Sequence, residues 1–161
     1  MPEILQHSDL SATYSGICDW LDVRAAYRHI HEERGGEWKY ENRPHLGAAV
    51  KFNLGGLSCS NRGRLSYRNR EDADNSWFFR NKLSFKFPLK ITKLAIQPYL
   101  ADEAFYDFDA CQMNRNRLYA AIALKLLDSL KAELYYLWQS KEGTSKWSDT
   151  HVPGTKPGPS F

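Results

Sequence analysis

The feature that most constrains the fold is a period-two alternation of apolar and polar side chains along the chain. In its clearest stretch, Asn114 to Leu126, apolar residues occupy every second position from Leu118 onward. Successive side chains of a β-strand point to opposite faces of a sheet, so this spacing predicts a strand. A helix over Leu118–Leu127 is the alternative, because Ala and Leu favour helices. The alternating Asn and Arg before this stretch, and Asp128-Ser129 after it, favour the strand.

The same two-faced pattern recurs in other segments of roughly 9–12 residues, the length with which a tilted β-strand crosses a bilayer. These segments lie at about 21–28, 43–52, 57–68, 77–87 and 130–139. No apolar run approaches the roughly 20 residues that a transmembrane helix needs. We therefore expect an all-β fold, an up-and-down antiparallel transmembrane β-barrel with about nine strands in this chain.

The predicted connections alternate in length. Tight turns are expected at Cys18-Asp19-Trp20, Leu54-Gly55-Gly56, Pro88-Leu89-Lys90 and Asp128-Ser129. Long polar loops are expected at about His31 to Asn42, Asn69 to Ser76, Asp102 to Gln112, and Ser140 to Thr150. Short periplasmic turns and longer outer loops are typical of outer-membrane barrels, so the pattern predicts a porin-like protein of a Gram-negative outer membrane.

Aromatic residues make up 14% of the chain, a high share, and they gather near the expected strand ends. Two belts on the apolar face would form the girdles that flank the lipid-facing band of a membrane barrel. The predicted girdle residues are Tyr27, Tyr67, Trp77, Phe79, Phe85, Phe87, Tyr136 and Trp138. The mean hydropathy of −0.59 fits this arrangement, because only every second strand residue faces lipid.

The opposite face is rich in basic residues, which we expect to line the lumen. They are Arg24, Arg28, Arg62, Arg64, Arg80, Lys82, Arg115, Arg117 and Lys125. Their predicted acidic partners are fewer, namely Asp22, Glu103 and Glu133. A lumen filled by ion pairs is the first interpretation. An anion-preferring pore or a phosphate or carboxylate site is the second, and arginines that hold lipopolysaccharide phosphates are the third.

Other candidate sites are weak, and we expect no catalytic residue, no metal and no cofactor. His29, His31, Glu32 and Glu33 are expected in a solvated loop rather than around a metal ion. Ser58, Ser60 and His45 fall on neighbouring strands, which leaves an outer-membrane lipid hydrolase as a remote alternative. The three cysteines have no metal-binding spacing, and the net charge of +3 is too small to argue for nucleic acid.

Four short motifs carry a family resemblance: Glu41–His45, Asn61–Arg68, Gln97–Glu103 and Asn114–Arg117. With them, the chain from Asp9 to Phe161 resembles a family of uncharacterised bacterial outer-membrane β-barrel proteins, the domain of unknown function 2490 (DUF2490). The resemblance implies a barrel and an outer-membrane location, and it implies no activity.

The two ends of the chain depart from that pattern. Residues 1–8 are expected to be a disordered remnant before a barrel domain over 9–161, and they do not resemble a signal peptide. An odd number of strands predicts that upstream strands are missing, because such barrels have an even number. Phe161 would be the terminal assembly signal read by the barrel-assembly machinery, although three nearby prolines weaken the last strand.

The leading hypothesis is thus a non-enzymatic integral outer-membrane barrel, structural or a small anion-preferring channel, with the lipid bilayer and lipopolysaccharide as partners. The alternative is a soluble β-barrel or sandwich that binds a small ligand. The direction of the apolar face distinguishes the two, because a soluble protein turns that face inward.

Overall fold

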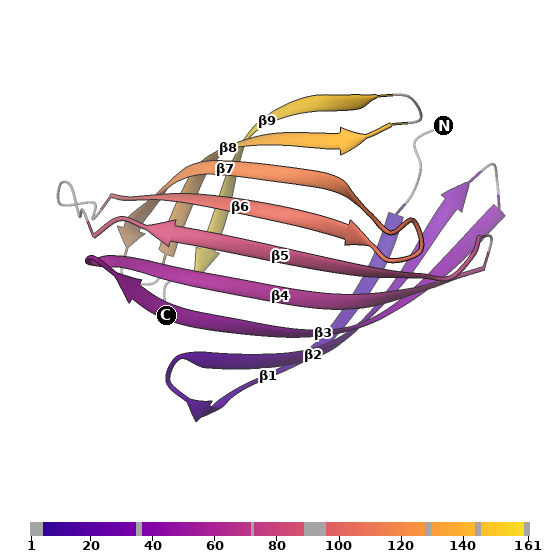
Figure 1. Ribbon diagram of the computed structural model, residues 1–161, viewed down its shortest axis with the longest axis horizontal. Coiled ribbons are helices and arrows are strands. Elements are labelled where there is room, and N and C mark those ends of the chain that lie inside the picture. The colour runs from indigo at the N-terminus through magenta and orange to yellow at the C-terminus, as the bar shows by residue number, and fades with distance from the viewer. Residues whose placement is uncertain are drawn as a thin grey trace. The chain divides into compact units, whose positions relative to one another are not determined.

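The computed structural model describes residues 5–34, 37–71, 73–88, 96–127, 130–143 and 146–159. Within these ranges, no helix has the length and hydrophobicity needed to cross a membrane. The described residues form nine strands that are joined in chain order (Figure 1). The strands are β1 (Leu5–Cys18), β2 (Leu21–Arg34), β3 (Glu37–Leu54), β4 (Leu57–Arg70), β5 (Ser76–Lys86), β6 (Gln97–Asp107), β7 (Gln112–Leu127), β8 (Leu130–Glu142) and β9 (Trp147–Pro159).

Each strand is hydrogen-bonded to the next one in the sequence, and the sheet order is β1 to β9. The pairs β1–β2, β2–β3, β7–β8 and β8–β9 are antiparallel. The predicted all-β, up-and-down antiparallel fold is therefore confirmed, and so is the strand over Asn114–Leu126, which lies within β7.

The register of the β2–β3 hairpin explains how one face becomes apolar. Alternate residues of the two strands lie opposite one another in the pairs Tyr27↔Pro44, Ala25↔Leu46, Val23↔Ala48 and Leu21↔Val50. The polar set falls in the intervening pairs, which include Arg28↔Arg43 and Arg24↔Gly47. A slip by one residue would exchange the faces of every side chain, so the hydrophobic pattern holds this register.

The predicted long loop over His31 to Asn42 is wrong, because this polar segment extends the strands. Residues 31–34 and 37–42 form the continued β2–β3 ladder, in which His31 pairs with Tyr40 and Glu33 pairs with Trp38. The backbone forms ladder hydrogen bonds whatever the side chain, so a polar composition at a strand end does not itself indicate a loop.

The connections at the other three predicted long loops are shorter than expected. Only Phe108–Cys111 separates β6 from β7, Glu71–Asn75 separates β4 from β5, and residues 143–146 separate β8 from β9. The tight turns at Asp19-Trp20 and Gly55-Gly56 are confirmed. The turn expected at Asp128-Ser129 lies outside the described residues. So do Leu89 and Lys90 of the turn expected at Pro88-Leu89-Lys90. The alternation of short and long connections is contradicted between β2 and β3, where β2 ends at Arg34 and β3 begins at Glu37.

The chain divides into two compact units. The first comprises Met1–Val50, Arg62–Arg80 and Tyr106–Gln112, and the second comprises Lys51–Asn61, Asn81–Phe105 and Met113–Phe161. Strand β1 begins at Leu5, so residues 5–8, which were expected to be disordered, lie in a strand.

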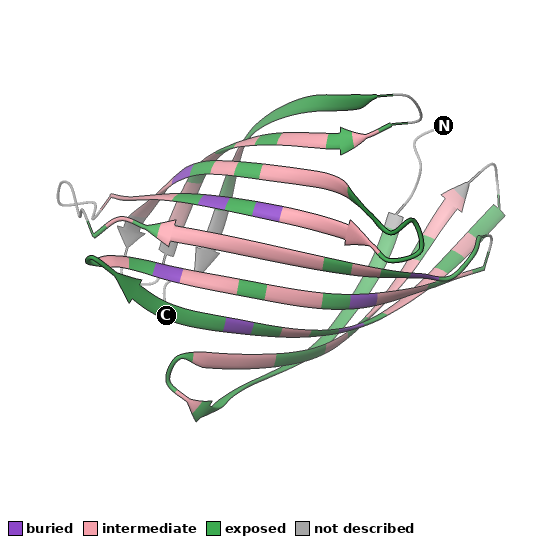
Figure 2. Cartoon of the chain, viewed as in Figure 1, coloured by how far each residue is buried: buried purple, intermediate pink, exposed green. Residues whose placement is uncertain are grey.

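Burial is inverted relative to a water-soluble protein in both units (Figure 2). In the first unit the side chains of Leu10 and Leu46 are 77% and 65% exposed, and in the second unit Leu54 is 61% exposed. The buried residues are instead small or polar: His45, Ala49, Ser66 and Ser76 in the first unit, and Cys59, Ala101, Glu103 and Ala121 in the second. The large apolar side chains therefore form an outward surface, not a core.

The backbone conformation of the turn between β3 and β4 can be tested by substitution. Gly55 has a φ of 54° and Gly56 a φ of 85°, values that L-residues with branched side chains rarely adopt. We expect Gly55→Val to lower the free energy of unfolding by about 1–2 kcal/mol and Gly55→Asn to lower it much less, because Asn tolerates the left-handed region. Urea unfolding followed by tryptophan fluorescence measures both, and equal losses would contradict the turn geometry.

Candidate functional site on the polar face

In the first unit, the polar face begins with an ion pair between β1 and β2. Asp9 lies opposite Arg28 in the register, and Arg28 lies opposite Arg43. The Arg28 Nε donates to Asp9 Oδ2 over 2.8 Å, and the Arg28 Nη2 contacts the same oxygen. The hydrogen bond from Arg24 Nη2 to Ser11 Oγ, 2.8 Å long, follows on the same face. Register alone brings these residues together.

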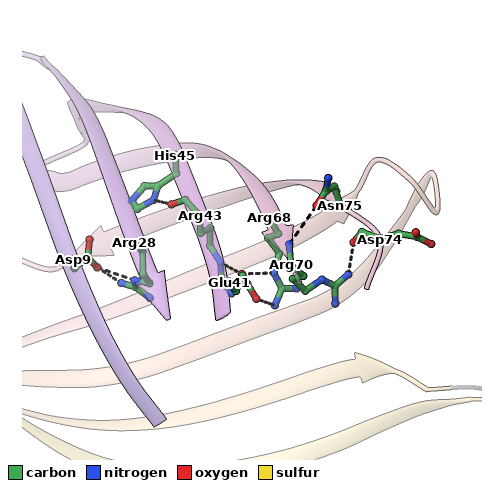
Figure 3. A network of polar contacts seen from close by, with 9 residues as sticks. All are labelled: Asp9, Arg28, Glu41, Arg43, His45, Arg68, Arg70, Asp74 and Asn75. Atoms are coloured by element: carbon green, nitrogen blue, oxygen red, sulfur yellow. Dashed lines mark hydrogen bonds and ion pairs between the residues drawn. The ribbon is translucent and has the colours of Figure 1, made fainter. Parts of the chain in front are cut away.

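Glu41 is the acidic centre of this unit and lies between two arginines (Figure 3). Its Oε1 accepts hydrogen bonds from Arg43 Nε at 2.6 Å and from Arg68 Nε at 3.0 Å, and its Oε2 accepts one from Arg68 Nη2 at 3.3 Å. The guanidinium of Arg68 also lies 5.1 Å from the ring centroid of Phe78. The Glu41 side chain is only 14% exposed, so these bonds are partly shielded from water.

Glu41 lies outside the segment 43–52 that is expected to span a membrane. Burial raises the pKa of its carboxyl group, but the hydrogen bonds and charges of Arg68 and Arg43 outweigh burial. The net effect holds the pKa of Glu41 below its ordinary value. The carboxylate is thus kept ionised by the two arginines that it joins.

In the described part of the second unit, Glu103 on β6 is the most buried carboxylate, with a side chain 4% exposed. Its Oε2 accepts a hydrogen bond of 3.0 Å from the Tyr119 hydroxyl and lies 3.6 Å from Arg117 Nη1. Arg117 Nε also donates to Gln139 Oε1 over 2.7 Å. A buried charge needs such partners, because desolvation without them would cost several kcal/mol.

Aromatic rings complete this second cluster. The Lys82 ammonium lies 4.0 Å from the ring centroid of Tyr119. The guanidinium carbons of Arg115 and Arg117 lie 5.2 Å and 5.0 Å from the ring of Phe105. These distances suit cation–π attraction, which holds the cations without removing their charge. On the same face the Tyr99 hydroxyl donates to the Glu133 carboxylate.

The structure therefore places most of the predicted polar residues in clusters of paired side chains. Of the predicted acids, Glu103 and Glu133 each have a described partner, and Asp22 is half-buried opposite Ala49. Arg62 is exposed, and Arg64 and Arg80 are half-buried. The side chain of Lys125 and all of Phe161 lie outside the described residues.

Sequence reasoning missed Asp9 and Glu41, two paired acids of the first unit. Glu41 was assigned to a loop, and Asp9 was taken only as the start of a strand. Counting residue pairs outward from the Asp19-Trp20 turn would have brought Asp9 within two positions of Arg28. Glu41 would have emerged only if β2 and β3 had been continued to Arg34 and Glu37.

The predicted girdle aromatics lie on the exposed face or near its edge. Tyr27, Trp77, Phe79, Tyr136 and Trp138 are exposed. Tyr67, Phe85 and Phe87 are half-buried. The rings of Tyr67 and Trp77 pack 4.9 Å apart between centroids.

The remaining candidates do not assemble into catalytic machinery in the described part of the chain. His45 is buried with its Nδ1 3.4 Å from the Arg43 carbonyl oxygen, whereas Ser58 is exposed. Among the described residues, no group of three or more His, Cys, Asp or Glu side chains could hold a metal ion. Cys18, Cys59 and Cys111 are free thiols.

These features define a class: an all-β, up-and-down antiparallel protein whose charged face is partly buried and whose apolar face is exposed. The family model described as "Protein of unknown function (DUF2490)" matches residues 9–150, and the chain belongs to this family. No curated protein and no solved structure matches it.

The importance of the Glu41 cluster is tested by removing its charge. We expect Glu41→Gln to lower the free energy of unfolding by about 1–3 kcal/mol, because two partly buried arginines lose their counter-charge. The matched control is Glu37→Gln on the same strand, whose side chain is 77% exposed and lies 3.4 Å from Lys39. It should change stability by less than about 0.5 kcal/mol. Equal effects in equilibrium urea unfolding would show that burial of the Glu41 cluster contributes nothing.

Proposed function

We propose that this chain is an integral β-barrel protein of the bacterial outer membrane with a structural, non-enzymatic role. The observation that carries the proposal is the inverted burial, with exposed Leu, Trp, Tyr and Phe on one face and small or charged residues on the other. A soluble barrel or sandwich buries its large apolar side chains, which is the opposite arrangement.

Exposed apolar area is costly in water, at about 25 cal/mol for each Å². Side chains such as Leu10 and Leu46, which are 77% and 65% exposed, would be stabilised if lipid covered them. Strands can enter lipid only where their backbone groups are paired, and the ladders from β1 to β9 provide that pairing. Both requirements of a lipid-facing sheet are thus supported within each unit.

The strand lengths agree with this proposal. Strand β3 has 18 residues and β7 has 16, more than the roughly 9–11 that cross a bilayer. The residues of β3 beyond this length lie at its polar end. The Glu41 cluster would therefore lie in water, outside the lipid. In this proposal the partners are the bilayer, lipopolysaccharide phosphates and the barrel-assembly machinery.

A charge placed on the apolar face tests the membrane proposal. We expect Leu46→Arg to destabilise the folded protein in lipid by about 2–4 kcal/mol, because position 46 is central in the expected span. Leu54→Arg is the matched control: Leu54 is similarly exposed at 61% but adjoins the turn, so the cost should be at most about 1 kcal/mol.

The measurement is urea unfolding of the protein folded into phospholipid vesicles. In a water-soluble protein both substitutions would be nearly neutral, because both leucines already face solvent. Small and equal effects, together with a stable monomer in detergent-free buffer, would reject the membrane proposal.

A small anion-preferring channel is the second candidate, and the ion pairs across strands β1 to β4 in the first unit favour it. There, three arginines (Arg28, Arg43 and Arg68) share the two carboxylates of Asp9 and Glu41 in the described contacts. The surplus positive charge would attract anions into any water-filled path along this face.

Conductance in a planar bilayer under a KCl gradient tests this second candidate. A reversal potential of the sign for chloride is expected, and Arg24→Gln should move it toward zero because Arg24 is an exposed cation of the polar face. Lys39→Gln, beyond the expected span, should leave it unchanged. If the protein did not conduct, or preferred cations, the channel candidate would be rejected and only the structural role would remain.

A further inference from the structure

We propose that the β2–β3 hairpin carries a binding site for a late first-row divalent metal ion, Zn²⁺ or Cu²⁺, whose protein ligands are His29 and His31. The two histidines are two residues apart on β2, so their side chains lie on the same face of the sheet. Their Nε2 atoms are 3.2 Å apart. The site is independent of the proposed membrane function, since it depends only on this hairpin.

The separation of the two nitrogens suits chelation of one ion. Two imidazole nitrogens bound to a tetrahedral ion at about 2.0–2.1 Å lie about 3.3 Å from each other. The rings of His29 and His31 are nearly perpendicular, at 83°, with centroids 4.4 Å apart. His31 Nε2 donates the hydrogen bond between the two rings, so a metal ion would displace that proton. A modest rotation about the terminal side-chain bonds, whose torsional preference is broad, then directs both lone pairs to a common point. Neutral imidazole is a preferred ligand of Zn²⁺ and Cu²⁺.

Asn42 on β3 sets the tautomer of His29. It lies directly opposite His29 in the register, and its Oδ1 is 2.6 Å from His29 Nδ1. The same oxygen accepts a hydrogen bond of 2.6 Å from the Tyr27 hydroxyl. An amide oxygen only accepts, so His29 Nδ1 carries the proton and its Nε2 is left with the lone pair that a metal needs. Orientation of a ligand histidine through its second nitrogen is a common feature of metal sites.

Aromatic rings of β3 restrain both histidines from the other strand. The ring of Tyr40 stacks on that of His29, and the ring of Trp38 meets that of His31 edge-on, each with a centroid distance of 6.3 Å. These contacts reduce the freedom that the imidazoles would lose on binding an ion. The pair is therefore partly organised before the metal arrives.

The coordination would be completed by water. No third His, Cys, Asp or Glu joins the pair among the described residues. His31 is exposed, so an ion would reach the site directly from solvent. A site with two protein ligands and open positions binds reversibly, which fits sensing or capture of an ion better than a permanent structural metal.

Metal titration of the untagged full chain, folded and stripped with a chelator, tests the site. Calorimetry with Zn²⁺ should give one ion for each chain, and the spin-resonance spectrum of Cu²⁺ should show two coordinating nitrogens. We expect His29→Ala and His31→Ala each to weaken binding at least about tenfold, because each removes one of two ligands.

The matched control is His7→Ala. His7 lies opposite Ile30 on the neighbouring strand β1, so it is close along the sheet but on its other face. Binding should be unchanged in this variant. Asn42→Ala should weaken binding and Asn42→Asp should restore it, because Asp retains the acceptor for His29 Nδ1. Far-UV circular dichroism checks that each variant is folded. If His29→Ala does not fold, the result for His31→Ala, whose ring is more exposed, tests the proposal.

Two results would overturn the proposal. In the first, the double variant His29→Ala/His31→Ala binds Zn²⁺ as tightly as the unchanged protein. In the second, His7→Ala weakens binding as much as His31→Ala does, which would indicate scattered surface histidines instead of a chelating pair.

Discussion

The in-register pairing of antiparallel strands is the constraint on which the rest of this structure depends. Across β1, β2 and β3 it aligns Leu10 with Tyr27 and Tyr27 with Pro44, and it aligns Asp9 with Arg28 on the other face. The separation of an apolar surface from a charged one follows directly, because side chains alternate along each strand. A change of register would place arginines among leucines.

The apolar face and the polar face have opposite solvation requirements. The apolar face needs a non-aqueous surrounding, which is why a bilayer is proposed for it. The polar face brings charges out of water, and two of its shielded carboxylates have polar partners there: Glu41 has two arginines, and Glu103 has Tyr119 and Arg117. Cation–π contacts, such as that of Lys82 with Tyr119, add to these pairings. The charged clusters stabilise the register because their partners come from neighbouring strands.

The hairpin end of β2 and β3 differs from the rest of the sheet. Its exposed face has His29, His31, Tyr40 and Trp38 in place of aliphatic side chains. Cross-strand pairs there are polar and aromatic, a composition that belongs at a water boundary rather than in lipid. A chelating pair and a membrane-facing sheet can therefore occupy the same strand at different depths.

The amino-acid sequence by itself determined the strands, their antiparallel order and the identity of the apolar face. The strands and the apolar face follow from a period of two that is visible without coordinates, and the antiparallel order follows from the tight turns that join the strands. Only the tertiary structure decided where the strands end and which charges meet. Polar residues such as Glu41 are compatible with a loop or with a strand, because backbone pairing is set by the neighbouring strand and not by their own side chains. The partners of Arg68 and Arg28 also depend on register, which a list of residues along one strand does not contain.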